Sequence, residues 1–209
     1  MDAFSQDFRR DLADLMAWRR DVRRFRIDPV DEAVLMRCLD TFQLAPSVGL
    51  SEPWRVIRVQ STQARAAALD NYRTANADAL AGYDGDQTAK YSQLKLSGME
   101  QAPEHVVVFC DDATPKGHGL GAGTMPEMRR YSVVGAITLM WLTARAEGLG
   151  MGWVSILDPD RLTRDLGVPG TWSLVAYLCI GWPETTSQTP ELETKGWEDR
   201  RGSVPIEIR

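Results

Sequence analysis

The run His105-Val106-Val107-Val108-Phe109-Cys110 decides the fold class of this 209-residue chain. Five of its six residues are apolar and none carries a full charge, which is typical of a strand buried on both faces. The sequence has apolar runs of strand length at 151–156 and 172–180 as well. Residues 54–59 alternate apolar and polar side chains, as in a strand with one polar face. We therefore expect a sheet with the 105–110 strand at its centre.

Between these runs the apolar residues recur at helical spacing. The longest such segment, 128–147, is apolar on almost every side, so we expect it in the centre of the domain or in a subunit interface. Helices and strands do not follow a strict β-α-β repeat, and the sequence therefore predicts the α+β class. The expected helices are 4–20, 30–42, 62–82, 87–101 and 128–147.

The length and composition predict one domain over residues 1–209. The chain is 44% hydrophobic and 25% charged, which is enough apolar material for a core. No linker or internal repeat divides it. The segment 183–209 is polar and contains prolines, so it cannot fold alone; we expect it to pack onto another surface.

Several classes of function are disfavoured. A net charge of −5 argues against a nucleic-acid partner, and no apolar run reaches the length of a membrane span. The N-terminus does not have the pattern of a signal peptide. Cys38, Cys110 and Cys179 are widely spaced and lie in apolar runs, as reduced thiols do in the cytoplasm. We expect a cytoplasmic protein.

Neither the two histidines nor the glycine-rich stretch 117–122 indicates a metal or dinucleotide site. His105 and His118 are too far apart to form a local ligand pair, and no cysteine stands at ligand spacing, so we expect no metal. The stretch 117–122 fits a dinucleotide-binding pattern formally, but Pro126 delays the next helix and no acidic residue follows at the required spacing. A mobile loop is the better interpretation.

The run Arg19-Arg20-Asp21-Val22-Arg23-Arg24-Phe25-Arg26 is the densest charged feature. Two interpretations remain open: a solvated helix end, where cations meet the negative end of the dipole, or a phosphate clamp, because the guanidinium fork matches phosphate oxygens. Asp21 inside this run is a carboxylate that could accept a hydrogen bond or a proton.

A set of motifs in collinear order resembles the nitroreductase-like superfamily. The flavin-binding part is Arg19–Arg23 together with 45–49 and Pro53-Trp54. Narrower matches resemble the branch that forms 5,6-dimethylbenzimidazole, and the likeness runs from about Trp18 to Arg201. These matches are Lys90-Tyr91 with 94–96, 144–148, 152–156, and Glu191-Leu192 with 195–197.

The resemblance implies a fold and a set of site residues. The fold is a homodimer with helices around a mixed, mainly antiparallel sheet, FMN at the subunit interface, and C-terminal segments (183–209) exchanged between subunits. The implied FMN-binding residues are Arg19, Arg20, Asp21, Val22, Arg23, Ser47, Ser155 and Arg200, with Asp21 and Ser155 in the chemistry.

The resemblance also implies a reaction. It is the oxygen-dependent fragmentation of reduced FMN to 5,6-dimethylbenzimidazole, the lower ligand of vitamin B12, with release of a four-carbon sugar phosphate. FMN is then a substrate, and a separate flavin reductase supplies its electrons. The segment from about 84 to 101 resembles a lid that excludes water. Alternatives are an FMN-dependent NAD(P)H nitroreductase and a flavin-storage dimer.

Overall fold

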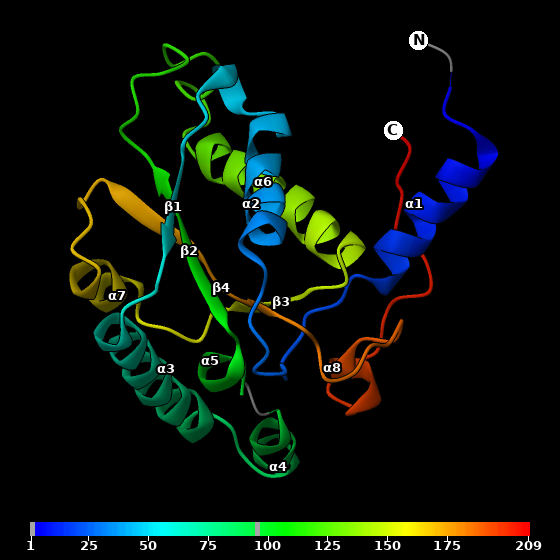
Figure 1. Ribbon diagram of the computed structural model, residues 1–209, viewed down its shortest axis with the longest axis vertical. Helices are drawn as coiled ribbons and strands as arrows, with labels where there is room; N and C mark the ends of the chain where they lie inside the picture. Colours follow the sequence, from blue (N-terminus) through cyan, green and yellow to red (C-terminus); the bar gives the residue numbers. More distant parts are fainter. Residues whose placement is uncertain (1–2, 95–96) are drawn as a thin grey trace.

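The computed structural model describes residues 3–94 and 97–209 (Figure 1). Its four strands are β1 (Trp54–Arg58), β2 (Glu104–Asp111), β3 (Gly150–Val154) and β4 (Trp172–Gly181). The α-helices are α1 (Gln6–Trp18), α2 (Glu32–Asp40), α3 (Thr62–Ala81), α4 (Asp86–Gln93), α5 (Gly98–Gln101), α6 (Met128–Ala146), α7 (Pro159–Asp165) and α8 (Glu191–Thr194). Short 3-10 turns, η1 (Thr41–Leu44) and η2 (Val48–Leu50), precede β1.

The strands form one sheet in the order β1-β2-β4-β3, with antiparallel pairing throughout. The predicted central position of the 105–110 strand is confirmed, since β2 pairs on both sides and residues 105–110 are buried. A parallel pairing enters only beside the sheet, through an isolated bridge between Asp21 and Met151 in the described residues. The α+β class and the mainly antiparallel sheet are therefore confirmed.

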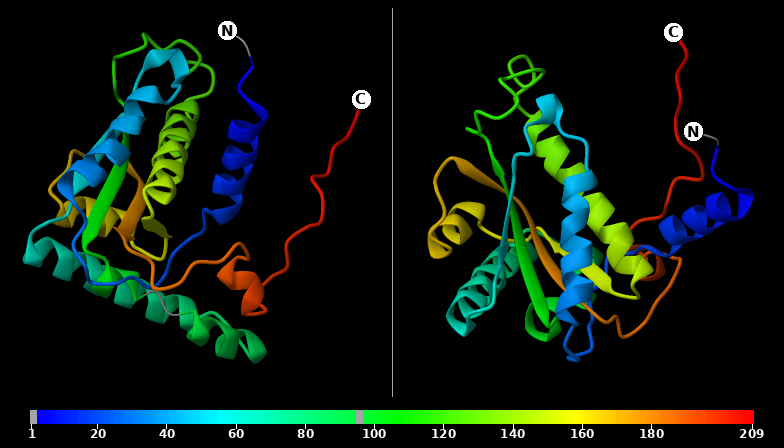
Figure 2. Two further views of the ribbon diagram at one scale, coloured as in Figure 1. Left: turned by 45° about the vertical axis from the view of Figure 1, so that its right-hand side comes forward. Right: turned by 45° about the horizontal axis from the view of Figure 1, so that its top comes forward.

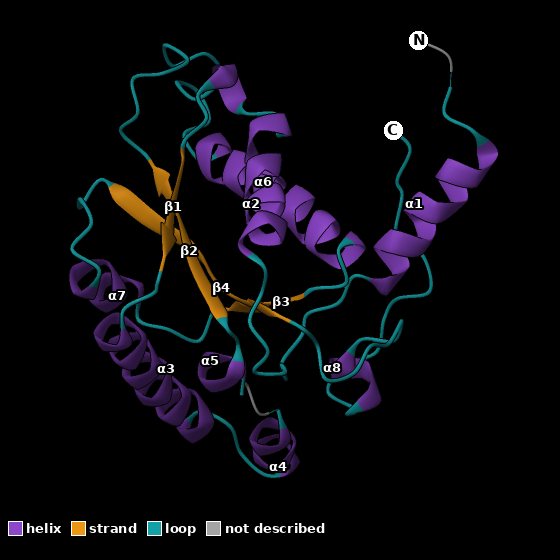
Figure 3. Cartoon of the chain, in the orientation of Figure 1, coloured by secondary structure: helices purple, strands orange, loops and turns teal. Residues whose placement is uncertain are grey.

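Helices cover both faces of the sheet, as Figure 3 shows. One core lies between the sheet and the pair α2 and α6, where Leu35 and Ile137 are fully buried. The second core lies under α3, α5 and α7 and includes Phe25 and Tyr177. Because β2 alternates its side chains between these two cores, it needs apolar residues at every position. This explains the run that decides the fold class.

Local sequence signals set the starts of four of the described α-helices. Ser5, Asp31, Ser61 and Asp158 each accept hydrogen bonds from first-turn amides of the helix that follows. The predicted helix at 87–101 is instead two helices, α4 and α5, and residues 95 and 96 of that segment and of its motif lie outside the described residues. The short helices α7 and α8 were not expected from the apolar spacing, because each spans two turns or fewer.

Three apolar surfaces remain exposed on a single chain. Phe4, just before α1, and Phe8, on α1, are 64% and 45% exposed, and α1 stands away from the body, as does the C-terminal end (Figure 2). On α6, Tyr131 and Val134 project outward although the opposite side of this helix is buried. The end of the chain alternates apolar residues, with Ile206 at 81% exposure. The 128–147 helix is thus central, as one of its two expectations had it, and it also presents an apolar strip to solvent; its place in a subunit interface stays a prediction.

Candidate functional site

The basic run lies directly against strand β3 in an extended conformation. The α1 helix ends at Trp18, so the arginines follow the helix instead of extending it. The amide of Val22 donates to the carbonyl of Met151 at 3.0 Å. This close approach depends on glycine: a Cβ at Gly152 would lie 2.2 Å from the carbonyl oxygen of Val22, and one at Gly150 would lie 2.7 Å from its side chain. The helix-end interpretation of the run is therefore wrong.

Asp21 is held at the junction of the run and β3. Its Oδ1 accepts a hydrogen bond from the backbone amide of Trp153 at 2.9 Å, and its Oδ2 lies 3.6 Å from Nε of Arg23. Burial raises the pKa of Asp21, while the Trp153 amide and the charges of Arg23 and Arg19 oppose that rise. The side chain still exposes 37% of its surface. Asp21 is thus a fixed, accessible carboxylate whose basicity exceeds that of an ordinary aspartate.

Because the backbone of the run is extended, successive side chains point to opposite sides. On one side Arg23 contacts Asp21, and the guanidinium of Arg19 stacks over the ring of Trp141 at 4.7 Å. On the other side Nε of Arg20 donates to the carbonyl of Gln188 at 2.6 Å. Arg24, four residues further on, also turns toward the segment that follows β4. The run therefore has two faces with different neighbours.

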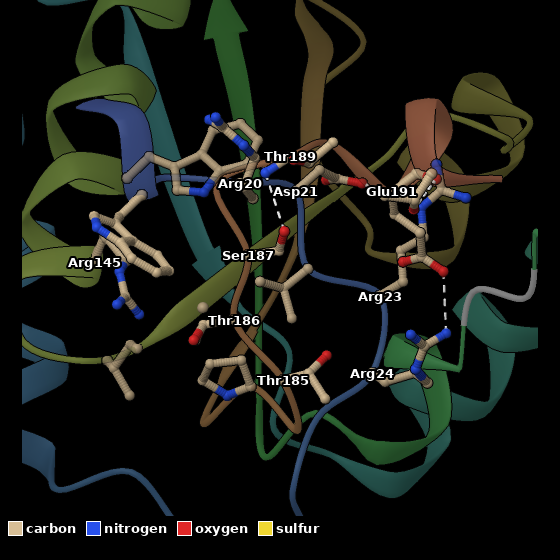
Figure 4. A pocket seen from close by; sticks show the side chains of 17 residues that line it. Arg20, Asp21, Arg23, Arg24, Arg145, Thr185, Thr186, Ser187, Thr189 and Glu191 are labelled. Carbon is tan, nitrogen blue, oxygen red and sulfur yellow. Dashed lines mark hydrogen bonds and ion pairs between the residues drawn. The ribbon is translucent and has the colours of Figure 1, made fainter. Parts of the chain in front are cut away.

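A pocket opens between this run, the C-terminal end of α6 and the segment after β4, and Figure 4 shows its lining. Its empty volume is about 800 Å³, including the open mouth. Arginines and hydroxyl groups supply many donors for anionic oxygens, and tryptophan and leucine supply apolar contact. This donor set fits a phosphorylated, partly aromatic molecule. The lining residues are Trp18, Arg20, Asp21, Val22, Arg23, Arg24, Trp141, Arg145, Leu149, Gly150, Pro183, Thr185, Thr186, Ser187, Thr189, Glu191 and Thr194.

Half of the predicted site residues meet in this pocket. Arg20, Asp21, Val22 and Arg23 line it. Arg19 does not line it but covers Trp141, which does. Arg200 lies near enough to matter electrostatically: burial lowers the pKa of Arg20 most, and the charges of Arg200 and Arg19 lower it further. The phosphate-clamp interpretation of the run stays a prediction, and Arg200 is not among the residues that line the pocket.

Ser155 lies just beyond β3, two residues after the amide that holds Asp21. It is exposed and lines a neighbouring cavity with Trp153 and Leu174, not the arginine pocket. Asp21 and Ser155 therefore flank the end of β3 from adjacent cavities.

Ser47 lies at the other end of α6, away from the remaining predicted residues. Its Oγ accepts from the amide of Glu52 at 3.1 Å, and the next residue, Val48, donates to Ser132 at the start of α6. A glycine-rich loop packs here, since a Cβ on Gly49 would meet carbonyl oxygens of that loop within 3 Å. A single chain does not bring Ser47 to Asp21.

The sequence reasoning missed several lining residues. Arg24 and Arg145 carry charge into the pocket, and 185–189 supplies a row of hydroxyl groups. Arg24 could have been predicted, because side chains alternate in an extended run and Arg24 is therefore on the same side as Arg20. The hydroxyl row had no recognisable motif.

The histidines, cysteines and carboxylates of the described residues have the following surroundings. The described residues contain no group of three or more His, Cys, Asp or Glu side chains placed to hold a metal ion. His105 is buried and bonds Tyr177 at 2.7 Å, and burial lowers its pKa to about 4. The three cysteines are free and buried. None of the described helices is both long and apolar enough to cross a membrane.

Known proteins share this fold and this sequence pattern. The model of the nitroreductase family matches residues 16–182, and the chain belongs to that family. The iodotyrosine deiodinase structure bound to FMN and 3-iodo-L-tyrosine superposes with a TM-score of 0.71 at 19% identity, covering 95% of this chain and 97% of that one. A nitroreductase-like protein from Bacillus cereus superposes with a TM-score of 0.64 at 18% identity, covering 100% and 98%. The nitroreductase-like fold is thus confirmed.

The closer similarity is to one kind of enzyme within the family. The chain is 52% identical to the 5,6-dimethylbenzimidazole synthase of Rhodospirillum rubrum, over 95% of this chain and 94% of that one. It is 48% identical to the synthase of the same name from Rhodobacter capsulatus, over 94% and 95%. The resemblance to the benzimidazole-forming branch is confirmed, and the protein is an enzyme of oxidoreductase type.

Proposed function

We propose that this protein fragments reduced FMN with molecular oxygen, giving 5,6-dimethylbenzimidazole and a four-carbon sugar phosphate. The observation that carries the proposal is the position of Asp21: a carboxylate of raised pKa, fixed to β3 by the Trp153 amide, in an arginine-lined pocket. The similarity to three synthases at 46–52% identity supports the same reaction.

The residues divide the work according to their chemistry. Arg19, Arg20 and Arg23, with Arg200, would hold the phosphate and ribityl chain, since guanidinium groups bind phosphate oxygens in pairs. This fixes the ribityl carbons near the ring. Asp21 would remove a proton during the fragmentation, for which its raised pKa suits it. Ser155 would orient the polar edge of the flavin by a hydrogen bond.

The proposed enzyme is a homodimer with FMN at the subunit interface. The exposed apolar strips of α1 and α6 support a partner copy, because solvated surfaces seldom keep such strips uncovered. The position of Ser47 also supports it, since only a second chain could bring a serine loop to the pocket. We propose that the C-terminal arm, residues 183–209, wraps the partner subunit while residues 183–197 also contact their own chain.

The remaining partners follow from the reaction. A separate flavin reductase would supply reduced FMN, and the protein would work in the cytoplasm, where such reductants are available. We propose no metal, no nucleic acid and no membrane partner. The segment 84–101, with α4 and α5, would shield the flavin from water.

The decisive experiment is an aerobic incubation of purified protein with FMN kept reduced by a separate reductase and NADH. We expect 5,6-dimethylbenzimidazole by mass spectrometry only when the protein is present. Asp21→Asn should lower its formation by about 10²–10⁴-fold, the usual contribution of a positioned base, with FMN affinity nearly unchanged. Asp28→Asn is the matched control, because Asp28 is an exposed carboxylate of the same segment.

Other outcomes would select a different function. Oxidation of NAD(P)H by the protein alone, with FMN recovered intact, would indicate a nitroreductase. Bound FMN that survives reduction and aeration without consumption of NADH would indicate flavin storage. Full activity of Asp21→Asn would remove Asp21 from the chemistry.

A further inference from the structure

The segment that leaves β4 returns to the basic run. The amide of Arg26 donates to the carbonyl of Trp182 at 2.8 Å, and the amide of Glu184 donates to the carbonyl of Arg24 at 3.2 Å. Residues 183–200, which we call the arm, then continue along the pocket and past α8. The arm therefore forms one wall of the pocket, and its position decides the shape of the site.

The arm is anchored first to the outward face of the run. Nη1 of Arg24 lies 3.1 Å from Oε1 of Glu191, whose side chain exposes only 20% of its surface. Arg20 adds its hydrogen bond to the carbonyl of Gln188. The carboxylate of Glu191 neutralises the charge of Arg24. The same carboxylate would repel an anionic ligand that approached Arg24. Arg24 is thus placed to hold the arm and not the ligand.

A second anchor joins the far end of the arm to α4. The ring of Trp197 meets the ring of Tyr83 edge-on with centroids 5.6 Å apart, and the ring of Tyr91 lies at 6.4 Å. Nζ of Lys90 donates to the carbonyl of Gly196 at 2.7 Å. Such edge-on aromatic contacts add attraction beyond the burial of their surface. The second anchor lies three residues before Arg200.

We propose that Arg24 and Glu191 are a positioning pair that, together with Trp197, sets the arm so that Arg200 stands at the anion pocket. The two anchors fix the arm on both sides of α8. Because only three residues lead from Trp197 to Arg200, Arg200 must stay close to the second anchor. Arg24 acts on the ligand only through this arrangement. The inference rests on the proposed function in one respect, that the anion is the phosphate of FMN.

The test is an exchange of the two charges. The variants are Arg24→Glu, Glu191→Arg and the double exchange, each measured for the affinity of FMN and of riboflavin, which lacks the phosphate. We expect each single variant to weaken FMN binding about tenfold, the scale of one charge-assisted contact, with riboflavin little affected. The double exchange should restore FMN affinity to within about threefold, because it rebuilds the pair with reversed polarity.

A direct role for Arg24 predicts the opposite result. If Arg24 binds the phosphate itself, the double exchange places a carboxylate against the phosphate, and FMN affinity stays low; that result overturns the proposal. Arg200→Ala should match the single variants, and Arg24→Glu should add almost nothing in the Arg200→Ala background. Full additivity of these two changes would also overturn it.

A second readout needs no flavin. Trypsin cleavage after Lys195, Arg200 and Arg201 should accelerate in both single variants and return to the wild-type rate in the double exchange. Arg161→Glu is the control, since it breaks a comparable ion pair with Asp70 on the opposite face of the sheet. Unchanged cleavage in the single variants would overturn the anchor. If the wild-type protein forms no benzimidazole, the proposed function is refuted. If the double exchange nevertheless restores the wild-type cleavage rate and FMN affinity, the proposal about the arm still holds.

Discussion

The two ends of helix α6 carry different kinds of surface. Its C-terminal end contributes Trp141 and Arg145 to a pocket rich in arginines. Its N-terminal end meets the loop before β1, where Ser132 accepts from the amide of Val48 beside Ser47. The first surface suits a phosphate, and the second offers hydroxyl and backbone groups to a neutral edge.

The separation of these ends teaches how the site is built. Ser132 and Trp141 are nine positions apart on the helix, which is about 13 Å of axial rise. Motifs that are collinear in the sequence therefore gather in two places on one chain. We infer that each chain offers two half-sites, and that a complete site combines the C-terminal end of one α6 with the N-terminal loop of another copy.

Mixed dimers give the largest expected effect. Asp21→Asn alters one half-site, and Ser47→Tyr would obstruct the other. Two inactive variants that share subunits at random should regain about a quarter of wild-type activity, because half of the dimers are mixed and each mixed dimer has one intact site. Co-expression with two affinity tags isolates the mixed dimers, and this doubly tagged fraction should have about half of the wild-type activity.

The matched control places both substitutions on the same chain and mixes it with wild-type chain. Here each mixed dimer has two sites with one altered half each, so the doubly tagged fraction should be inactive. If instead the mixture of single variants stays inactive while this control is half active, Asp21 and Ser47 serve the same site within one chain, and the comparison of the two ends fails.

Gly152→Ala tests the C-terminal half-site alone. The new Cβ would lie 2.2 Å from the carbonyl of Val22, so the basic run must leave β3 and the bond between Trp153 and Asp21 breaks. We expect a loss of stability of about 1–3 kcal/mol and a loss of benzimidazole formation of about 100-fold or more. Urea unfolding and the coupled assay measure the two effects.

Gly170→Ala is the control for this substitution, since a Cβ there meets open space. A Gly152→Ala protein with wild-type activity would show that contact between the run and β3 is not needed for the chemistry.

Much of the fold was predictable because its signals are local. The fully apolar 105–110 run predicted the central strand, and helical spacing located α1, α2, α3 and α6. The 87–101 segment was predicted as one helix, although it contains two, because its polar residues give little periodicity. Short elements such as α7 depend on a cap and on tertiary contacts, which apolar spacing does not reveal.

The site was predictable in its residue types but not in its assembly. The motif named Asp21 and Arg23, and both line one pocket. The sequence could not show that Glu191, 167 positions later, neutralises Arg24, since that pairing depends on the path of the arm. Nor could it show that Ser47 lies at the far end of α6, because spacing along the chain says nothing about distance between loops.

The last and smallest effect concerns the stability cost of Asp21 in the C-terminal half-site. Burial raises the pKa of Asp21, so the folded state binds its proton more tightly than the unfolded chain does. The unfolded pKa is about 4. Between that pH and the higher folded pKa, the folded state binds more protons than the unfolded chain, so the free energy of unfolding falls as pH rises. Asp21→Asn cannot ionise and keeps an oxygen for the Trp153 amide. Its unfolding temperature should therefore exceed that of the wild type at pH 7, with the gain shrinking toward zero below about pH 4. Calorimetry across this range, beside the exposed Asp28→Asn, measures the gain; a lower unfolding temperature for Asp21→Asn at pH 7 would mean that the contacts with Arg23 and Trp153 outweigh the desolvation of the carboxylate.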